Sequence, residues 1–233
     1  MTSGYLLEIC VESVAAAEAA ERGGANRIEL CSELRVRGLT PRADLMRDAR
    51  ERVRIPIHAM IRPRDGDFFY SDAEFAAMKR DLEAAKRAGM DGAVLGIMTR
   101  DGRVDVGRTR ELVELAHPLP VTFHRAFDEC ADLMTALEEV IRTRAARILT
   151  SGGKQSVAEG LLNLAQLVKA ARGRIVIVPG GGVRSDNVAR IVRETTAPEF
   201  HSALSGVFPH PEADILGFET EVRKLAAILA ANR

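Results

Sequence analysis

The chain alternates between short apolar runs and longer stretches in which polar and apolar residues recur at helical spacing. The apolar runs, rich in Val, Ile and Leu, predict strands over residues 6–11, 27–31, 56–61, 92–97, 120–124, 147–150, 175–178 and 199–203. The stretches between them predict helices over residues 14–22, 41–52, 72–88, 106–116, 133–142, 157–172, 185–194 and 218–231. Ser13 is a predicted N-cap, and Thr40 followed by Pro41 is typical of a helix start.

This alternation predicts the fold class. Apolar strands without strict alternation favour a parallel sheet that is buried on both faces. Eight strand–helix units in 233 residues are typical of an α/β protein with a single (β/α)8 TIM barrel. No linker or low-complexity segment divides the chain, so we expect one domain over residues 1–233. The alternative is an open doubly wound sheet, which usually has fewer strands and a glycine-rich turn after the first one.

Composition and charge narrow the function classes. The chain has 33 Lys and Arg against 33 Asp and Glu, 4% aromatic residues and no Trp, so we expect no nucleic-acid partner. No apolar run of about 18 residues is present, so we expect no membrane partner. Residues 1–5 lead directly into a strand without the features of a secretory leader, and three cysteines favour reduced thiols. These features predict a cytoplasmic protein, and we expect no nucleotide cofactor.

Polar side chains gather at the carboxyl ends of the predicted strands, where parallel α/β folds usually bind ligands. Residues two apart on a strand share a face, so Glu8 points with Cys10, and Glu29 points with Cys31. If these neighbouring strands have comparable register, two thiols and two carboxylates face each other. Cys130, at the entrance to a later helix, is interpreted as structural.

The candidates for a polar pocket all lie in or directly after predicted strands; they are Glu8, Glu29, His58, Arg62, His124, Arg125, Asp128 and His201. Buried carboxylates are rare without a partner. Glu8 and Glu29 are therefore either acid/base groups or members of a structural network with Arg62, Arg125 or Arg27. Arg62 also opens a polar loop, residues 62–71, of the length of an active-site lid.

Residues 121–128, VTFHRAFD, carry a short strand directly into a cluster of ionisable groups. An imidazole, a guanidinium and a carboxylate at a buried strand end are costly to desolvate unless they pair or bind something. His124 and Arg125 cannot both face inward from a regular strand. We expect one of them to line the pocket and the other to brace it, against Asp128.

Two glycine-rich turns follow the sixth and seventh predicted strands. Their residues predict an anion-binding site and are Ser151, Gly152, Gly153, Gly180, Gly181 and Gly182. Backbone N–H groups in such turns can approach an anion, and many barrels bind phosphate at this end of the strand series. The alternative interpretation is that the glycines only permit tight turns.

Together these motifs resemble the CutC family of copper homeostasis proteins. The resemblance runs from about residue 8 to residue 202, through segments 8–10, 25–32, 59–64, 66–71, 94–96, 122–128, 147–152 and 179–183. It implies a TIM barrel, a cytoplasmic location, a homo-oligomer and a role in copper tolerance, with Cu(I) bound at Cys10 and Cys31. Two segments depart from the family pattern: residues 37–42 read RGLTPR where GGLTPS is common, and Ala203-Leu204 replace a pair of small residues.

Two functions are compatible with these residues. The first is Cu(I) binding by Cys10 and Cys31, with Met60 as a soft auxiliary ligand. Zinc is less expected, because a closed site needs four ligands and these would come from distant strands.

The second function is an enzyme that acts on a small anionic or phosphorylated metabolite, in which arginines hold the anion and the carboxylates and histidines transfer protons. No reaction can be assigned from the residues, and the absence of lysine among the candidates argues against a Schiff base. A purely structural module would leave the inward charges unexplained.

Overall fold

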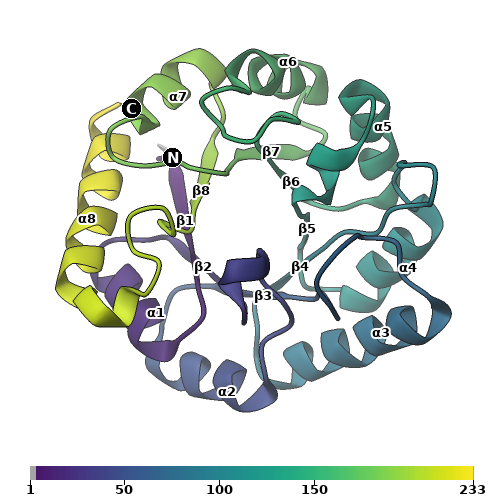
Figure 1. Cartoon of the computed structure of the whole chain (residues 1–233), viewed down its shortest axis with the longest axis horizontal. Coiled ribbons are helices and arrows are strands. Elements are labelled where there is room, and N and C mark those ends of the chain that lie inside the picture. The colour runs from purple at the N-terminus through teal and green to yellow at the C-terminus, as the bar shows by residue number, and fades with distance from the viewer. Residues whose placement is uncertain (1–3, 233) are drawn as a thin grey trace.

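Eight parallel strands form a barrel that eight helices surround (Figure 1). The computed structural model describes residues 4–232. The strands are β1 Leu6–Val11, β2 Arg27–Leu30, β3 Ile57–Met60, β4 Gly92–Leu95, β5 Val121–Phe123, β6 Arg147–Thr150, β7 Val176–Pro179 and β8 Glu199–Ser202. The helices are α1 Val14–Arg22, α2 Ala43–Arg52, α3 Asp72–Arg87, α4 Val106–Ala116, α5 Leu133–Thr143, α6 Leu161–Ala171, α7 Val188–Thr195 and α8 Ile215–Ala231. The predicted TIM barrel is confirmed.

The barrel closes by bringing the two ends of the sequence together. The strand order is β7-β6-β5-β4-β3-β2-β1-β8, so β1 pairs in parallel with both β2 and β8. Helix α1 likewise packs against α8 in the outer ring (Figure 1). Side chains on β1 and β8, about 190 residues apart in sequence, therefore become neighbours inside the barrel.

The apolar core lies between the strands and the helices, whereas the barrel interior is polar. Outward-facing strand residues such as Leu7, Ile9, Ile28 and Phe200 are fully buried under the helix layer. The alternate positions of the same strands carry buried charged groups. Both faces of the sheet are thus covered, as expected for parallel strands. No helix within residues 4–232 has the length and apolar character needed to span a bilayer.

The start of α2 was wrongly predicted. The helix begins at Ala43, after Arg42, and Thr40 caps no helix. The Thr40 hydroxyl instead donates to the Arg62 carbonyl (3.1 Å) and accepts the Arg62 N–H (3.0 Å). A tertiary contact with the loop after β3 has replaced the local capping that the sequence suggested.

Three other helix starts differ from the prediction, while the Ser13 cap is confirmed by its bond from the Ala16 N–H (3.2 Å). Helix α6 begins at Leu161 instead of residue 157, and α7 begins at Val188 instead of residue 185. Residues 157–160 and 185–187 form turns instead. Helix α8 begins at Ile215, three residues earlier than predicted, and follows a short 3-10 helix, η3 Pro211–Asp214.

Two more 3-10 helices lie in the loops after the strands. They are η1 Leu34–Val36, after β2, and η2 Arg125–Glu129, after β5. Neither was predicted, since such short turns leave little periodic signal. Both lie at the carboxyl ends of the strands and help to form the mouth of the barrel.

Candidate functional site

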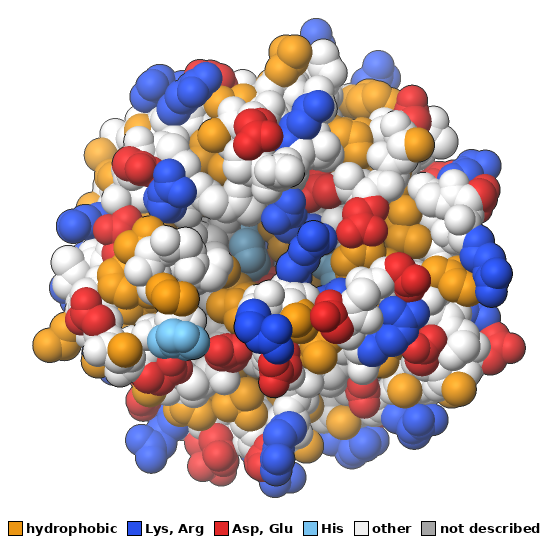
Figure 2. All heavy atoms as spheres, in the orientation of Figure 1, with side chains coloured by type: hydrophobic (Ala, Val, Ile, Leu, Met, Phe, Trp, Pro, Cys, Tyr) orange, Lys and Arg blue, Asp and Glu red, His pale blue; other side chains and the backbone are white. Residues whose placement is uncertain are grey.

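A cavity of about 200 Å³ opens at the carboxyl ends of the strands. Figure 2 shows it as a hollow at the centre of this face, with histidine side chains inside and Lys or Arg side chains at its border. Its lining includes six of the sequence candidates, which are Cys10, Glu29, Arg62, His124, Arg125 and His201. Gly181 and Gly182 of the second glycine turn also line it.

Two thiols lie close together at the base of the cavity, where Cys10 lines it and Cys31 is buried behind Cys10. The Cys10 and Cys31 sulfur atoms are 3.6 Å apart, both side chains are buried, and Met60 and Val94 pack around them. The hydrogen bond with Cys31, together with burial, raises the pKa of the Cys10 thiol. The structure thus places two closely spaced sulfur atoms, both soft potential ligands, at the base of an open cavity.

The strand register around these thiols differs from the expected one. Cys10 lies opposite Glu29, and Glu8 lies opposite Arg27, so β2 is offset by two residues relative to β1. The condition of comparable register is therefore not met, and the Glu8 and Glu29 carboxylates lie in different layers. The cause is the stagger between strands that closure of a tilted barrel requires.

Glu8 belongs to a buried ion-pair network below the cavity. Its carboxylate accepts a hydrogen bond from the Arg27 guanidinium, which also donates to Glu199 (2.7 Å), and Glu199 accepts from Arg147 (2.8 Å). Burial by itself would raise the pKa of Glu8, but the Arg27 charge and the His201 hydrogen bond outweigh it and hold that pKa far below its usual range. Of the structural partners considered for Glu8, Arg27 is the correct one.

Glu29 stands one layer higher, beside Cys10 and His201. One donor atom from each of these three residues lies within 4.8 Å of the others. The Glu29 Oε2 atom is buried without a hydrogen-bond partner within residues 4–232, and burial raises the pKa of Glu29. Burial would lower the pKa of His201, but Glu29 and Glu8 raise it overall. Barrel closure makes β1, β2 and β8 adjacent, so these three potential ligands come together although their strands are far apart in sequence.

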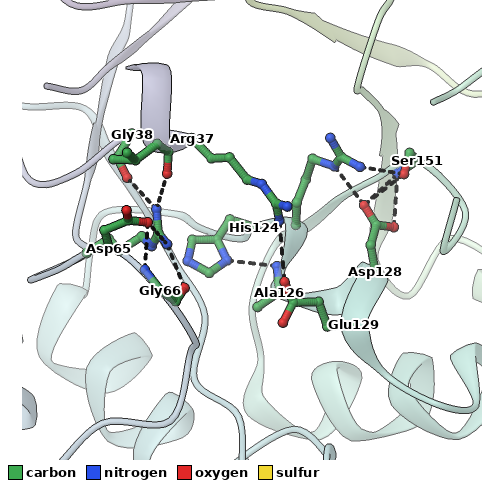
Figure 3. Close-up of polar contacts among 12 residues, drawn as sticks. Arg37, Gly38, Asp65, Gly66, His124, Ala126, Asp128, Glu129 and Ser151 are labelled. Atoms are coloured by element: carbon green, nitrogen blue, oxygen red, sulfur yellow. Dashed lines mark hydrogen bonds and ion pairs between the residues drawn. The ribbon is translucent and has the colours of Figure 1, made fainter. Parts of the chain in front are cut away.

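His124 and Arg125 both line the cavity, whereas only one of them was expected to do so. Strand β5 ends at Phe123, so His124 turns inward and its Nδ1 accepts the Ala126 N–H (3.2 Å), as Figure 3 shows. Burial, reinforced by the Arg62 charge, lowers the pKa of His124 to about 3. Arg125 donates to Asp128 (2.7 Å) and thereby braces the site, while the rest of its guanidinium reaches the cavity.

Arg62 connects two loops at the mouth. Its guanidinium donates to the carbonyl oxygens of Val36 (2.6 Å), Gly38 (3.1 Å) and Gly66 (3.0 Å), so the loops after β2 and β3 share one buried cation (Figure 3). The loop over residues 62–71, which has the length of a lid, is tied down by these bonds.

Three pocket candidates do not line the cavity, namely Glu8, His58 and Asp128. Glu8 is consumed by its pairing with Arg27. His58 lies deeper in the barrel and packs against Gly92, so closely that a Cβ atom on Gly92 would lie 2.4 Å from the His58 imidazole. Burial lowers the pKa of His58 to about 3. Asp128 is held by the first glycine turn.

The two glycine turns differ in whether their backbone N–H groups are already bonded within the chain. In the turn after β6, the Asp128 carboxylate accepts the N–H groups of Ser151 (3.0 Å) and Gly153 (2.9 Å). The Gly152 N–H donates to the Thr150 hydroxyl (2.8 Å). The first turn is therefore already filled by a carboxylate of the chain itself, and only the second turn borders the cavity.

Several residues at the mouth of the cavity were not among the predicted site residues. Arg184 and residues 204–206 line the cavity, and Arg37 reaches across its opening to Glu129 (3.3 Å), as Figure 3 shows. Arg37 was noticeable as a departure from the family pattern, whereas Glu129 carried no signal. Cys130 lies outside the cavity with its sulfur 3.9 Å from that of Met98, and burial raises the pKa of its thiol to about 12.

Comparison with known proteins identifies relatives of this chain. The family model described as "CutC family" matches residues 5–206. A mouse protein named copper homeostasis protein cutC homolog is 50% identical over 199 residues, covering 85% of this chain and 73% of the relative. Its human counterpart is 48% identical over the same coverage.

Solved structures agree with this relationship. A crystal structure of a CutC protein from Streptococcus agalactiae superposes with a TM-score of 0.80 at 32% identity, covering 85% of this chain and 98% of that one. A thiamine phosphate pyrophosphorylase from Pyrococcus furiosus has a TM-score of 0.66 at 16% identity over 99% of this chain and 97% of that one. The second likeness shows the barrel fold alone.

Proposed function

Since this chain belongs to the CutC family, whose mouse and human members are named copper homeostasis proteins, we propose that it binds Cu(I) through Cys10 and Cys31. The observation that carries the proposal is the 3.6 Å separation of the Cys10 and Cys31 sulfur atoms, of which Cys10 lines the open cavity and Cys31 lies buried directly behind it. Thiolates are preferred ligands of Cu(I). We include a cytoplasmic location and self-association in the proposal, as the family relationship suggests.

The spacing of the sulfur atoms suits one shared ion. Metal–thiolate bonds of about 2.3 Å, the value for zinc, place two sulfurs at most about 4.6 Å apart around one metal. A separation of 3.6 Å therefore corresponds to a bent arrangement with space for a third ligand. Glu29 and His201 each have a potential ligand atom within 4.8 Å of the Cys10 sulfur and are candidates for that third ligand.

The surroundings also favour a soft ion over a hard one. Met60 packs directly against the two thiols, and its thioether is a ligand that copper accepts readily and that zinc, calcium and magnesium do not favour. Because the Cys10 thiol is neutral in the free protein, the ion must displace its proton, and binding should weaken as the pH falls.

The test is a competition between the protein and a chromogenic Cu(I) chelator under reducing, anaerobic conditions. The wild type is expected to withdraw one Cu(I) per chain, and the double variant C10S/C31S is expected to withdraw none. The matched control is C130S, which removes the buried thiol outside the cavity and should bind as the wild type does. Circular dichroism spectra would confirm that each variant is folded.

Two results would contradict the proposal. One is an unchanged Cu(I) affinity in C10S/C31S. The other is a wild-type protein that, offered both ions at equal concentration, retains zinc instead of copper when the bound metal is measured.

A further inference from the structure

The turn after β7 has backbone donors that nothing in the chain uses. The N–H groups of Gly181, Gly182 and Val183 have no acceptor within residues 4–232, although all three residues line the cavity. The neighbouring carbonyl groups show which way two of these donors point. The Gly181 carbonyl accepts the Val157 N–H (2.8 Å), and the Gly182 carbonyl accepts the Asn187 side chain (2.8 Å), both on the side of the helix layer.

A trans peptide group holds its N–H opposite to its C=O. The N–H groups of Gly182 and Val183 are therefore directed away from the helices and toward the cavity. Gly181 and Gly182 have φ values of +90° and +94°, which residues with a side chain rarely adopt. Glycine at these two positions therefore allows this orientation of the N–H groups.

A guanidinium completes the arrangement. Arg125 uses its Nε and Nη2 atoms to bind Asp128 and Ser151, whereas its Nη1 atom has no acceptor within the described chain. An added Cβ atom on Gly181 would lie 2.9 Å from that Nη1 atom, so the free edge of Arg125 faces the turn. Arg184 also lines the cavity, and within residues 4–232 its guanidinium pairs only with the exposed Asp186 (3.3 Å).

The chain itself shows what such a turn can hold. The equivalent turn after β6 already binds an oxyanion, the Asp128 carboxylate, through two backbone N–H groups. The turn after β7 offers a similar set of donors to the cavity, with a cation beside it and no carboxylate of the chain in it. Donors arranged in this way are typical of phosphate sites at this end of a barrel.

We propose that the turn over residues 181–183, together with Arg125 and Arg184, binds the phosphate group of a small phosphorylated molecule whose body lies in the cavity. One water needs only about 10–15 Å³ of cavity volume, so the cavity volume of about 200 Å³ can hold the body of a small molecule. The site is separate from the two thiols and goes beyond Cu(I) binding, since its donors come from different loops.

The test is a titration of isotope-labelled protein with inorganic phosphate, followed by amide chemical shifts. We expect the Gly182 and Val183 signals to move in a saturable way, while the Ser151 and Gly153 signals, whose N–H groups are held by Asp128, stay in place. Parallel titrations with glycerol phosphate and with acetate identify the source of the anion. The phosphate ester should bind at least as well as phosphate, and acetate should bind more weakly.

Charge-removing variants measure how much Arg125 and Arg184 each contribute to phosphate binding. R125Q is expected to weaken phosphate binding at least about tenfold, because a charge-assisted hydrogen bond is lost. R184Q, which leaves all buried contacts intact, should weaken it a few-fold. The matched control R190Q removes a cation from the exposed face of α7, where Arg190 pairs with Glu194, and should bind as the wild type does.

The proposal is overturned if the Gly182 and Val183 signals do not move, if the Ser151 and Gly153 signals move instead, or if R184Q and R190Q bind phosphate equally. C10S/C31S should bind phosphate normally. A failure of the copper proposal would therefore leave this result unaffected, and the reverse also holds.

Discussion

Two layers of side chains inside the barrel differ in how charge is balanced. Glu8 and Arg27 form the lower layer, and Cys10 and Glu29, two positions further along the same strands, belong to the cluster at the mouth. In the lower layer, Arg27 and Glu8 are both ionised and neutralise each other directly. At the mouth, burial and the Cys31 hydrogen bond raise the pKa of Cys10, and burial and the Arg62 charge lower the pKa of His124, so both groups are neutral. Glu29 has a buried oxygen without a partner within residues 4–232. The carboxylates of the lower layer are paired with arginines, although Arg147 Nη1 and His58 Nδ1 are buried there without a partner within residues 4–232. At the mouth, by contrast, a carboxylate oxygen itself lacks a partner, and this difference makes the mouth the better place for a ligand.

The two glycine turns repeat this contrast on the other side of the barrel. The turn after β6 is closed by Asp128, and the turn after β7 is open to the cavity. Similar sequence patterns thus serve a structural role in one loop and present free donors in the next.

The largest effect is expected from R27M, which removes the cation of the lower layer. Breaking a buried ion pair leaves an uncompensated charge, so the free energy of unfolding in urea should fall by about 3 to 5 kcal/mol. The control R22M breaks the pair between Arg22, about half exposed (52%), and Glu219, and should cost no more than about 1 kcal/mol. Equal losses in the two variants would show that the lower layer is not a paired network.

The next effect tests whether the mouth keeps His124 neutral. Burial and the Arg62 charge lower the pKa of His124 to about 3 from its ordinary 6.5, so the unfolded chain takes up the proton more readily than the folded one. Stability should therefore fall as the pH decreases below about 6.5, by about 2 to 3 kcal/mol at pH 4.5. H124Q should lack this part of the acid sensitivity when unfolding is measured across the pH range. H210Q, which removes an exposed histidine, should keep the wild-type profile, and an identical profile in H124Q would contradict the prediction.

The smallest effect is expected from D128N, which weakens the hydrogen bonds that the Ser151 and Gly153 N–H groups of the first glycine turn donate to residue 128. An amide offers one acceptor oxygen where the carboxylate offers two, so the free energy of unfolding should fall by about 1 to 2 kcal/mol. The Ser151 and Gly153 amides should also exchange their hydrogens faster. The control D132N changes an exposed N-cap, where Asn is about as effective as Asp, and should alter stability by only a few tenths of a kcal/mol. Unchanged exchange in D128N would mean that the two turns do not differ.

The candidate site was only partly accessible from the sequence. The inward positions of Cys10 and Glu29 followed from the two-residue period of strands, because that period is a local property. The offset between β1 and β2 is set by barrel closure and determines that Glu8 meets Arg27 instead of Glu29. The pairing of Arg37 with Glu129 joins two loops 92 residues apart, and no local pattern indicates it.

The sequence by itself determined the eight strand–helix units, the barrel that they form and the family, because these depend on periodicity and on motifs read along the chain. Only the tertiary structure decided which polar groups satisfy each other and which stay free. That decision depends on the stagger of the strands, on β8 closing against β1, and on Asp128 reaching the turn after β6 but not the one after β7. Each is a relation between segments far apart in sequence, and its free energy is set by burial and distance in space.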